Sequence, residues 1–430
     1  MEGVTEVYFQ RGRLAARASR VKEAEEALVE ALGLARATGS VYQEVNIRLE
    51  QSSVTYLRGE TAAAEKQARE AIDLARRAGM SNLASRGLTN LGSALFVRGD
   101  LDTAEKVFRE ALDYGRSQGL KRPAAVAQFL LASLHVQKGD LRTAFSELDV
   151  AQAFFEAGGY RRELGQTLVL RSRAYRHQGN YEAALQTAQK QLELAKGPGD
   201  QAQAALAQET VASSLLVLER FPEALDAYRK ATDLSRPLGD KVGLGYALMN
   251  SGKVCARLGL YAEAEQALAE AEKLAGGTGG LEALRMSLAL ARAEIAMSRE
   301  RFSEVIGIAK QVVARPSQQR RTVLDARMLG AMALARSGTP GRALRIADEV
   351  LEAARSLDDP YRFSRFRLAW SEIRLAAGRT GDARQAAAEE LDRFEKAGQL
   401  DSAWRCAAVL TLAEGRGAAA DSARTRARQI

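Results

Sequence analysis

Histidine and cysteine, the residue types most often used in catalysis and metal binding, are scarce: this chain of 430 residues has two of each. His135 and His177 have no carboxylate or cysteine at the spacing of a metal site or a catalytic triad. We therefore interpret both as ordinary helix histidines. Cys255 and Cys406 fall on apolar stripes without partner spacing, which indicates buried, inert thiols in a reducing compartment.

The glycine-rich stretches do not form a phosphate-binding loop. Residues 243–253 read GLGYALMNSGK, but the spacing is wrong for such a loop, and Val254 stands where a hydroxyl is needed. The run GGTGG at 276–280 is typical of a joint between units rather than of an anion nest. No motif supports catalysis, a metal or a cofactor, so we predict that the protein is not an enzyme.

Regular spacing is the strongest feature of the sequence. Glycine recurs every forty residues at seven positions, which are Gly39, Gly79, Gly119, Gly159, Gly199, Gly239 and Gly279. Alanine keeps step from Ala24 to Ala264, and Val305, Ala343 and Ala383 continue the period less regularly. Self-similarity at this period predicts one supersecondary unit copied end to end.

Residues 81–119 show what one unit contains. Apolar side chains recur at helical spacing before and after Gly99, where the chain turns; they are Leu83, Leu88, Leu91 and Leu95, then Leu101, Ala104, Phe108 and Ala111. Gly119 is expected to end the second helix. Gly92 and Ala104 are small enough to let the two helices approach closely. The unit is therefore predicted to be a helical hairpin, which must stack on its neighbours to bury enough apolar surface.

The pattern resembles the tetratricopeptide repeat (TPR) family over roughly residues 5–400, with Leu91, Gly92 and Phe108 in the best-matching unit. The forty-residue unit resembles the repeats of Pins/LGN-like scaffolds, Rap-type peptide sensors and MalT-like bacterial regulators. The resemblance implies an all-α, right-handed superhelical solenoid of about ten antiparallel helix hairpins with a C-terminal capping helix. First helices are then expected to line its concave side. The resemblance also implies that His135 falls on a core-facing position and His177 on a groove-facing one.

We predict a single TPR-like solenoid over the whole chain, residues 1–430. Its repeats are regular over 1–279 and degenerate over 280–400, and 401–430 form the capping helix and tail. Residues 401–413, with Trp404 on an apolar stripe, are expected to begin an eleventh hairpin that closes the C-terminal end.

Composition and charge argue against membranes and nucleic acids as partners. The N-terminus lacks the apolar core of a signal peptide, and no apolar stretch reaches the length of a membrane span, so we predict a cytoplasmic protein. The net charge of +8 comes from alternating signs, which is typical of solvated helix faces. Aromatic-basic clusters are missing and the basic tail is short, comprising Arg416, Arg424, Arg426 and Arg428.

The resemblance also implies a peptide-binding groove on the first helices. Its positions fall on Arg86, Asn90, Ser93, Phe96, Phe129, Leu130, Ser133, Val136, Leu170, Arg173, Arg176, Asn250 and Lys253. Asn90 and Asn250 stand where related proteins hydrogen-bond a peptide backbone, although an asparagine bound to water fits equally. An apolar wall with basic flanks predicts that units three to six bind an acidic amphipathic peptide. Alternatively, the longer helices turn these apolar residues into the core.

Together these features predict a non-catalytic scaffold that binds a protein or peptide. The alternative is a sensor or oligomerisation segment of a larger bacterial signalling regulator: a transcription activator, a Ser/Thr kinase or a protease-associated protein. Phe9 and Gly12 are already in repeat register near the start of the chain, as expected for a fragment. The last three units carry Met328, Met332 and other adaptable residues, which suits a second partner or self-association through the terminal repeats.

Overall fold

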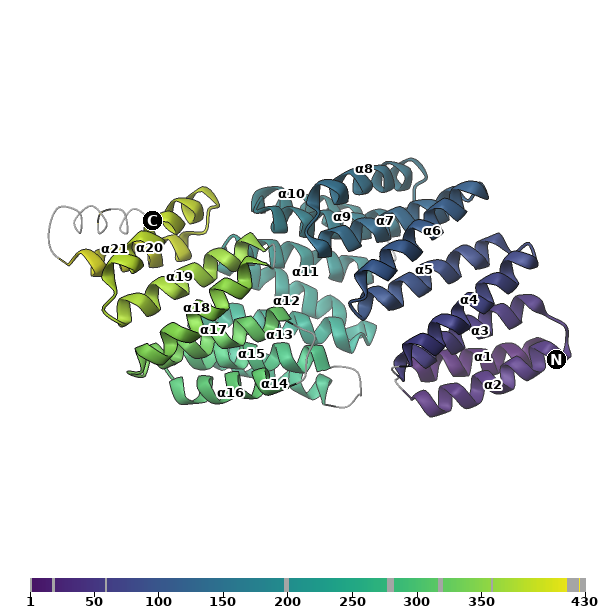
Figure 1. The fold of residues 1–430 in the computed structure, drawn as a ribbon, viewed down its shortest axis with the longest axis horizontal. Helices are drawn as coiled ribbons and strands as arrows, with labels where there is room; N and C mark the ends of the chain where they lie inside the picture. Colours follow the sequence, from purple (N-terminus) through teal and green to yellow (C-terminus); the bar gives the residue numbers. More distant parts are fainter. Residues whose placement is uncertain are drawn as a thin grey trace. The chain divides into compact units, whose positions relative to one another are not determined.

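The computed structural model describes residues 2–17, 20–58, 60–196, 201–276, 282–315, 320–356, 359–415 and 425. Within these ranges the secondary structure is entirely helical (Figure 1), which confirms the prediction of an all-α solenoid of helix hairpins. Several positions singled out in the sequence lie outside the described residues; they are Gly199, 277–280, Arg416, Arg424, Arg426 and Arg428.

The helices fall into two compact units that meet within α9, between Thr167 and Leu168. The first unit contains α1 (Glu2–Arg17), α2 (Val21–Ala37), α3 (Val41–Leu57), α4 (Thr61–Arg77), α5 (Ser81–Val97), α6 (Leu101–Ser117), α7 (Lys121–Lys138), α8 (Leu141–Ala157) and the start of α9 (Arg161–Gln178). The division of the repeats at residue 279 stays a prediction.

The second unit contains the rest of α9 and all later helices. These are α10 (Tyr181–Ala195), α11 (Gln201–Val217), α12 (Phe221–Ser235), the 3-10 helix η1 (Arg236–Leu238), α13 (Lys241–Arg257), α14 (Tyr261–Ala275), α15 (Glu282–Ser298), α16 (Phe302–Ala314), α17 (Arg320–Arg336), α18 (Pro340–Arg355), α19 (Pro360–Ala376), α20 (Thr380–Lys396) and α21 (Leu400–Glu414).

Glycine and a capping side chain produce the turns inside and between hairpins. Gly99 has φ +84° in the turn between α5 and α6, and the Asp100 side chain then accepts a 3.2 Å hydrogen bond from the Thr103 N–H. Gly119, with φ +66°, ends the hairpin as expected from the sequence. Glu219 and Glu300 occupy turns of the same kind with φ +59° and +57°, a conformation that costs a non-glycine residue about 1–2 kcal/mol.

Close packing within a hairpin depends on Gly92. A Cβ at Gly92 would lie only 2.5 Å from Cε1 of Phe108, so the glycine makes room for the phenylalanine ring. Phe108 is fully buried in one cluster with Leu91 and Leu95. Each hairpin of this kind therefore packs a large side chain of its second helix against the backbone of its first.

The second unit closes on itself through contacts between residues 144 to 183 positions apart. The Gln399 amide donates a 2.8 Å hydrogen bond to the Val217 carbonyl, and Arg257 pairs with Asp401. Ser402 donates to the Glu219 carboxylate from its N–H at 2.9 Å and from its hydroxyl at 2.5 Å. We call these contacts the clasp. They bring the start of α21 against the turn between α11 and α12.

The Glu219 carboxylate acts as a cap for α21 supplied by a distant hairpin. Ser402 is the third residue of α21, and its N–H is one of the amides that no residue within the helix can accept from. A negative charge at this end also interacts favourably with the helix dipole. Trp404 is 52% exposed and does not belong to the buried face of α21, which Ala403, Cys406 and Ala407 form.

Candidate functional site: a basic cavity in the second unit

A cavity of about 520 Å³ lies within the second unit. Its wall comes mainly from one helix of each hairpin, and these helices are α9, α11, α13, α15, α17, α19 and α21. Tyr228 adds a side chain from α12. The first helices of the hairpins thus face inward in this unit, as the resemblance to TPR proteins implied.

The apolar part of the cavity wall is rich in methionine. Met297, Met328 and Met332 line it from α15 and α17, beside Phe366 and Tyr361 of α19. Methionine side chains are flexible and polarizable, so they adapt to ligands of different shape. Tyr361 is held in place by an edge-on contact with Tyr181, with the ring centroids 5.9 Å apart.

Positive charge dominates the polar part of the wall. Seven lining residues are basic, namely Arg176, Lys253, Arg257, Arg336, Arg362, Arg365 and Arg405, whereas only Glu294 and Asp325 are acidic. Several cations are already neutralised within the protein. Lys253 lies 3.1 Å from Glu294, Arg362 lies 3.0 Å from Asp325, and Arg405 lies 2.8 Å from Glu372.

Arg176 differs from these paired cations. In the described part of the chain it forms no ion pair, and its Nε is buried without a hydrogen-bond partner. Burial lowers the pKa of Arg176, and the charge of Arg173 lowers it further. The pKa of Glu209 is raised by burial, and this carboxylate makes no ion pair among the described residues.

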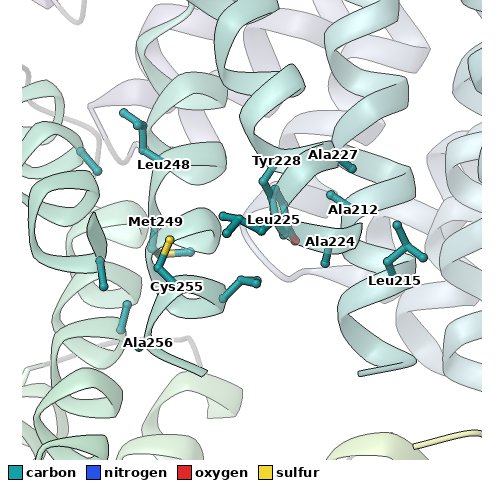
Figure 2. Packing of buried hydrophobic residues seen from close by; sticks show 14 of the residues in the cluster. Ala212, Leu215, Ala224, Leu225, Ala227, Tyr228, Leu248, Met249, Cys255 and Ala256 are labelled. Atoms are coloured by element: carbon teal, nitrogen blue, oxygen red, sulfur yellow. The ribbon is translucent and has the colours of Figure 1, made fainter. Parts of the chain in front are cut away.

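Tyr228 places an unsatisfied hydroxyl beside the same cavity. Its side chain is completely buried on the face of α12 that also carries Ala224 and Leu225 (Figure 2). The hydroxyl has no hydrogen-bond partner within the described residues. Burial raises the pKa of Tyr228, so the hydroxyl keeps its proton and remains a donor.

The structure brings only part of the predicted groove together. Arg176, Asn250 and Lys253 line the cavity. Arg173 lies one turn before Arg176 on α9 and is exposed. Leu170 is only 4% exposed, which corrects the expectation that it faces an open groove.

The other predicted positions lie on α5 and α7 in the first unit. Arg86 and Asn90 are exposed, while Ser93, Phe96, Phe129, Leu130 and Ser133 are half-buried. Phe96 and Leu130 pack against the same core cluster as Leu91. Val136 is only 2% exposed, so it too does not line an open groove. The alternative that the long helices turn apolar residues into the core holds at Val136 and Leu170.

The two histidines differ in environment. His135 is buried, with Nδ1 2.7 Å from a Glu147 oxygen and Nε2 3.7 Å from Glu105. The resemblance to TPR proteins placed His135 correctly in the core, and the structure adds a carboxylate partner, because Glu147 lies opposite it on the second helix of the hairpin. The hydrogen bond to Glu147 raises the pKa of His135. Burial lowers the pKa of His177 to about 4.

Several lining residues had no signal in the sequence. Tyr228 belongs to a second helix, which the groove pattern excludes, and Tyr361, Arg362 and Arg405 belong to the degenerate repeats and the capping helix. They line the same cavity as Arg176 because the second unit closes on itself. Neither a helix suited to crossing a membrane nor a group of three potential metal-ligating side chains is found within the described ranges.

Comparison with known proteins identifies the architecture. The sequence profile of the MalT-like TPR region matches residues 54–366. The quorum sensor NprR from B. thuringiensis in its apo form is similar in fold, with 12% identity, a TM-score of 0.56, and coverage of 82% of this chain and 97% of that one. NprR in complex with its cognate peptide NprX gives a TM-score of 0.51 at 12% identity, with coverage of 82% and 99%.

A third similar structure is a signal transduction ATPase of the STAND class with a TPR sensor, from Pyrococcus horikoshii. It shares 18% identity and a TM-score of 0.51, and the match covers 83% of this chain but 54% of that one. A search of curated proteins finds no match. At these identities the solved structures establish the shared fold.

Proposed function

Because this chain belongs to the family of MalT-like TPR regions, we propose that it is a non-catalytic cytoplasmic scaffold that binds a peptide in the cavity of its second unit. The observation that carries the proposal is the cavity itself. Its volume of about 520 Å³ lies in the range of pockets that hold small ligands, about 300–1,000 Å³. It also combines methionine and aromatic side chains with an excess of basic groups.

The lining favours an acidic amphipathic peptide. Met328, Met332 and Phe366 offer apolar contacts, and Arg176 and Arg336 offer positive charge without an ion-paired carboxylate among the described residues. Asn250 places a side-chain amide in the same cavity, where it can hydrogen-bond a peptide backbone. NprR, whose solved structure holds its cognate peptide NprX, is an example of this fold with a peptide ligand.

A second candidate function is that of a sensor segment in a larger signalling regulator. The match to the TPR region of MalT-like proteins favours it, as does the STAND protein, of whose length this chain spans about half. The two candidates agree on peptide or ligand capture. They differ in whether an effector domain receives the signal.

Binding of a selected peptide tests the proposal. Peptides selected from a random library on the full chain are measured by calorimetry against Asn250→Trp, which fills the cavity, and Asn90→Trp, which occupies the equivalent repeat position on α5 of the first unit. We expect Asn250→Trp to abolish binding and Asn90→Trp to leave it within about twofold, because interactions of independent sites do not couple. The opposite pattern would move the site to the first unit.

A further inference from the structure

One wall of the cavity combines positive charge with hydrogen-bond donors that the protein itself does not use. Arg176 lines the cavity from α9 and Tyr228 lines it from α12, while Arg173 lies one turn before Arg176 on α9 and is not a lining residue. Arg176 Nε and the Tyr228 hydroxyl are both buried, and neither finds a partner in the described part of the chain. Because an unsatisfied buried donor lowers stability, such atoms usually have a ligand or water to satisfy them.

The charge around these donors is unbalanced. Arg321 of α17 interacts electrostatically with Arg173, so a third cation lies near the pair. Glu209 is the nearby carboxylate, and burial disfavours its charged form. An anion placed here would interact favourably with several cations at once and would offset the cost of burying Arg176.

Apart from Arg336, whose side chain is exposed, the other cations of the cavity do not offer the same opportunity. Lys253, Arg362 and Arg405 already contact Glu294, Asp325 and Glu372, respectively. Arg365 donates to the Tyr361 hydroxyl at 3.3 Å and lies over its ring. The α9 and α12 wall is therefore the part of the cavity best suited to a further negative charge.

This inference rests on the function proposed above and names the chemical group that the site recognises. We propose that Arg176 and Tyr228 bind a carboxylate of the peptide ligand, with Arg173 supplying a second positive charge. A guanidinium presents parallel N–H donors that match the two oxygens of a carboxylate, and a neutral phenol adds one further donor. Met328 and Phe366 then lie in the same cavity to contact apolar parts of the ligand.

Two small probes test the recognition of charge on the full chain. N-acetyl-leucine carries a carboxylate, and N-acetyl-leucinamide is its neutral analogue. Both are titrated into protein with ¹³C-labelled tyrosine while the NMR signal of Tyr228 is followed. We expect saturable binding of N-acetyl-leucine and binding of the amide at least about tenfold weaker, because a charge-assisted pair is lost. Equal binding of the two probes would overturn the proposal.

Variants of the wall test the residues. Arg176→Met should weaken binding of N-acetyl-leucine about 10- to 100-fold, and Tyr228→Phe about 3- to 10-fold, because each loses hydrogen bonds to a charged group. Arg109→Met, which removes an exposed arginine on α6, is the matched control and should change nothing. Tyr228→Phe should also keep or raise the melting temperature, since it removes a buried hydroxyl without a partner. Unchanged affinity in Arg176→Met would refute the assignment.

A third probe separates carboxylates from phosphates. If phenyl phosphate binds and N-acetyl-leucine does not, the carboxylate assignment is overturned. The failure of this inference is also distinguishable from that of the proposed function. If a library-selected peptide binds the Arg176→Met variant as tightly as it binds the wild type, only the carboxylate site is refuted. If N-acetyl-leucine binds saturably but no binding peptide can be selected, only the proposed peptide binding is refuted.

Discussion

The contribution of the clasp to stability can be predicted by comparing Glu219, which belongs to it, with Glu300, which does not. Both glutamates have a left-handed backbone conformation at equivalent turns. Replacing either by glycine relieves about 1–2 kcal/mol of backbone strain in the folded state. Glycine also raises the conformational entropy of the unfolded chain, which offsets about 0.5–1 kcal/mol of this gain. Glu300 is exposed, and its side chain makes no hydrogen bond among the described residues. Glu300→Gly should therefore stabilise the protein by about 0.5–1 kcal/mol.

Glu219→Gly receives the same relief but loses the cap of α21. Two hydrogen bonds to the carboxylate disappear, from the Ser402 N–H at 2.9 Å and its hydroxyl at 2.5 Å. At about 1.5 kcal/mol or more for each bond to a charged group, the loss is about 3 kcal/mol. We expect a net destabilisation of about 2 kcal/mol, or about 3 kcal/mol relative to Glu300→Gly.

Urea unfolding followed by tryptophan fluorescence measures the difference in unfolding free energy between the two variants in the part of the chain that contains the clasp. The two tryptophans of the chain, Trp370 and Trp404, lie on α19 and α21. Hydrogen exchange of the Ser402 amide gives a second readout, and its protection should fall in Glu219→Gly but not in Glu300→Gly. Equal stabilisation of both variants would refute the idea that Glu219 holds the second unit closed.

Two further predictions concern packing and pH in the first unit. Gly92→Ala should destabilise the protein by about 1–3 kcal/mol in urea unfolding, because the added Cβ would overlap the Phe108 ring. The control is Gly33→Ala, which has open space around it and should stabilise the protein by about 0.5–1 kcal/mol. Comparable effects at both sites would contradict the packing argument. The raised pKa of His135 means that its pairing with Glu147 stabilises most below about pH 6.5 and less as the pH rises through the folded pKa. The stability difference between wild type and His135→Gln should therefore shrink from pH 5.5 to pH 8.5, and a pH-independent difference would argue against a charged histidine.

The sequence predicts the local structure well because each hairpin is specified by its own residues. The turn at Gly99, the end of the hairpin at Gly119 and the close approach at Gly92 all follow from short-range patterns, and all appear in the structure. The contact of Gly92 with the Phe108 ring was not predicted, because spacing along a helix does not show where a side chain of the facing helix lies.

The candidate site was less predictable because it depends on small rotations that add up over many repeats. A shift of one residue turns a side chain by about 100° around a helix, which is enough to bury Val136 and Leu170 while leaving Arg176 in the cavity. The clasp joins Glu219 to Ser402 across several hairpins, and a repeat pattern describes only contacts between neighbours. Closure, and with it the contribution of Tyr361 and Arg405 to the cavity, therefore had no signal in the sequence.

Methyl NMR of methionine tests the central claim most directly, because the chain carries its own reporters. Met297, Met328 and Met332 line the cavity of the second unit, and Met80 lies beside the core of the first. With ¹³C-methyl methionine in the full chain, addition of a library-selected peptide should shift the signals of the three cavity methionines and leave that of Met80 in place. A peptide that binds but shifts only Met80, or none of the four, would contradict the assignment of the binding site to this cavity.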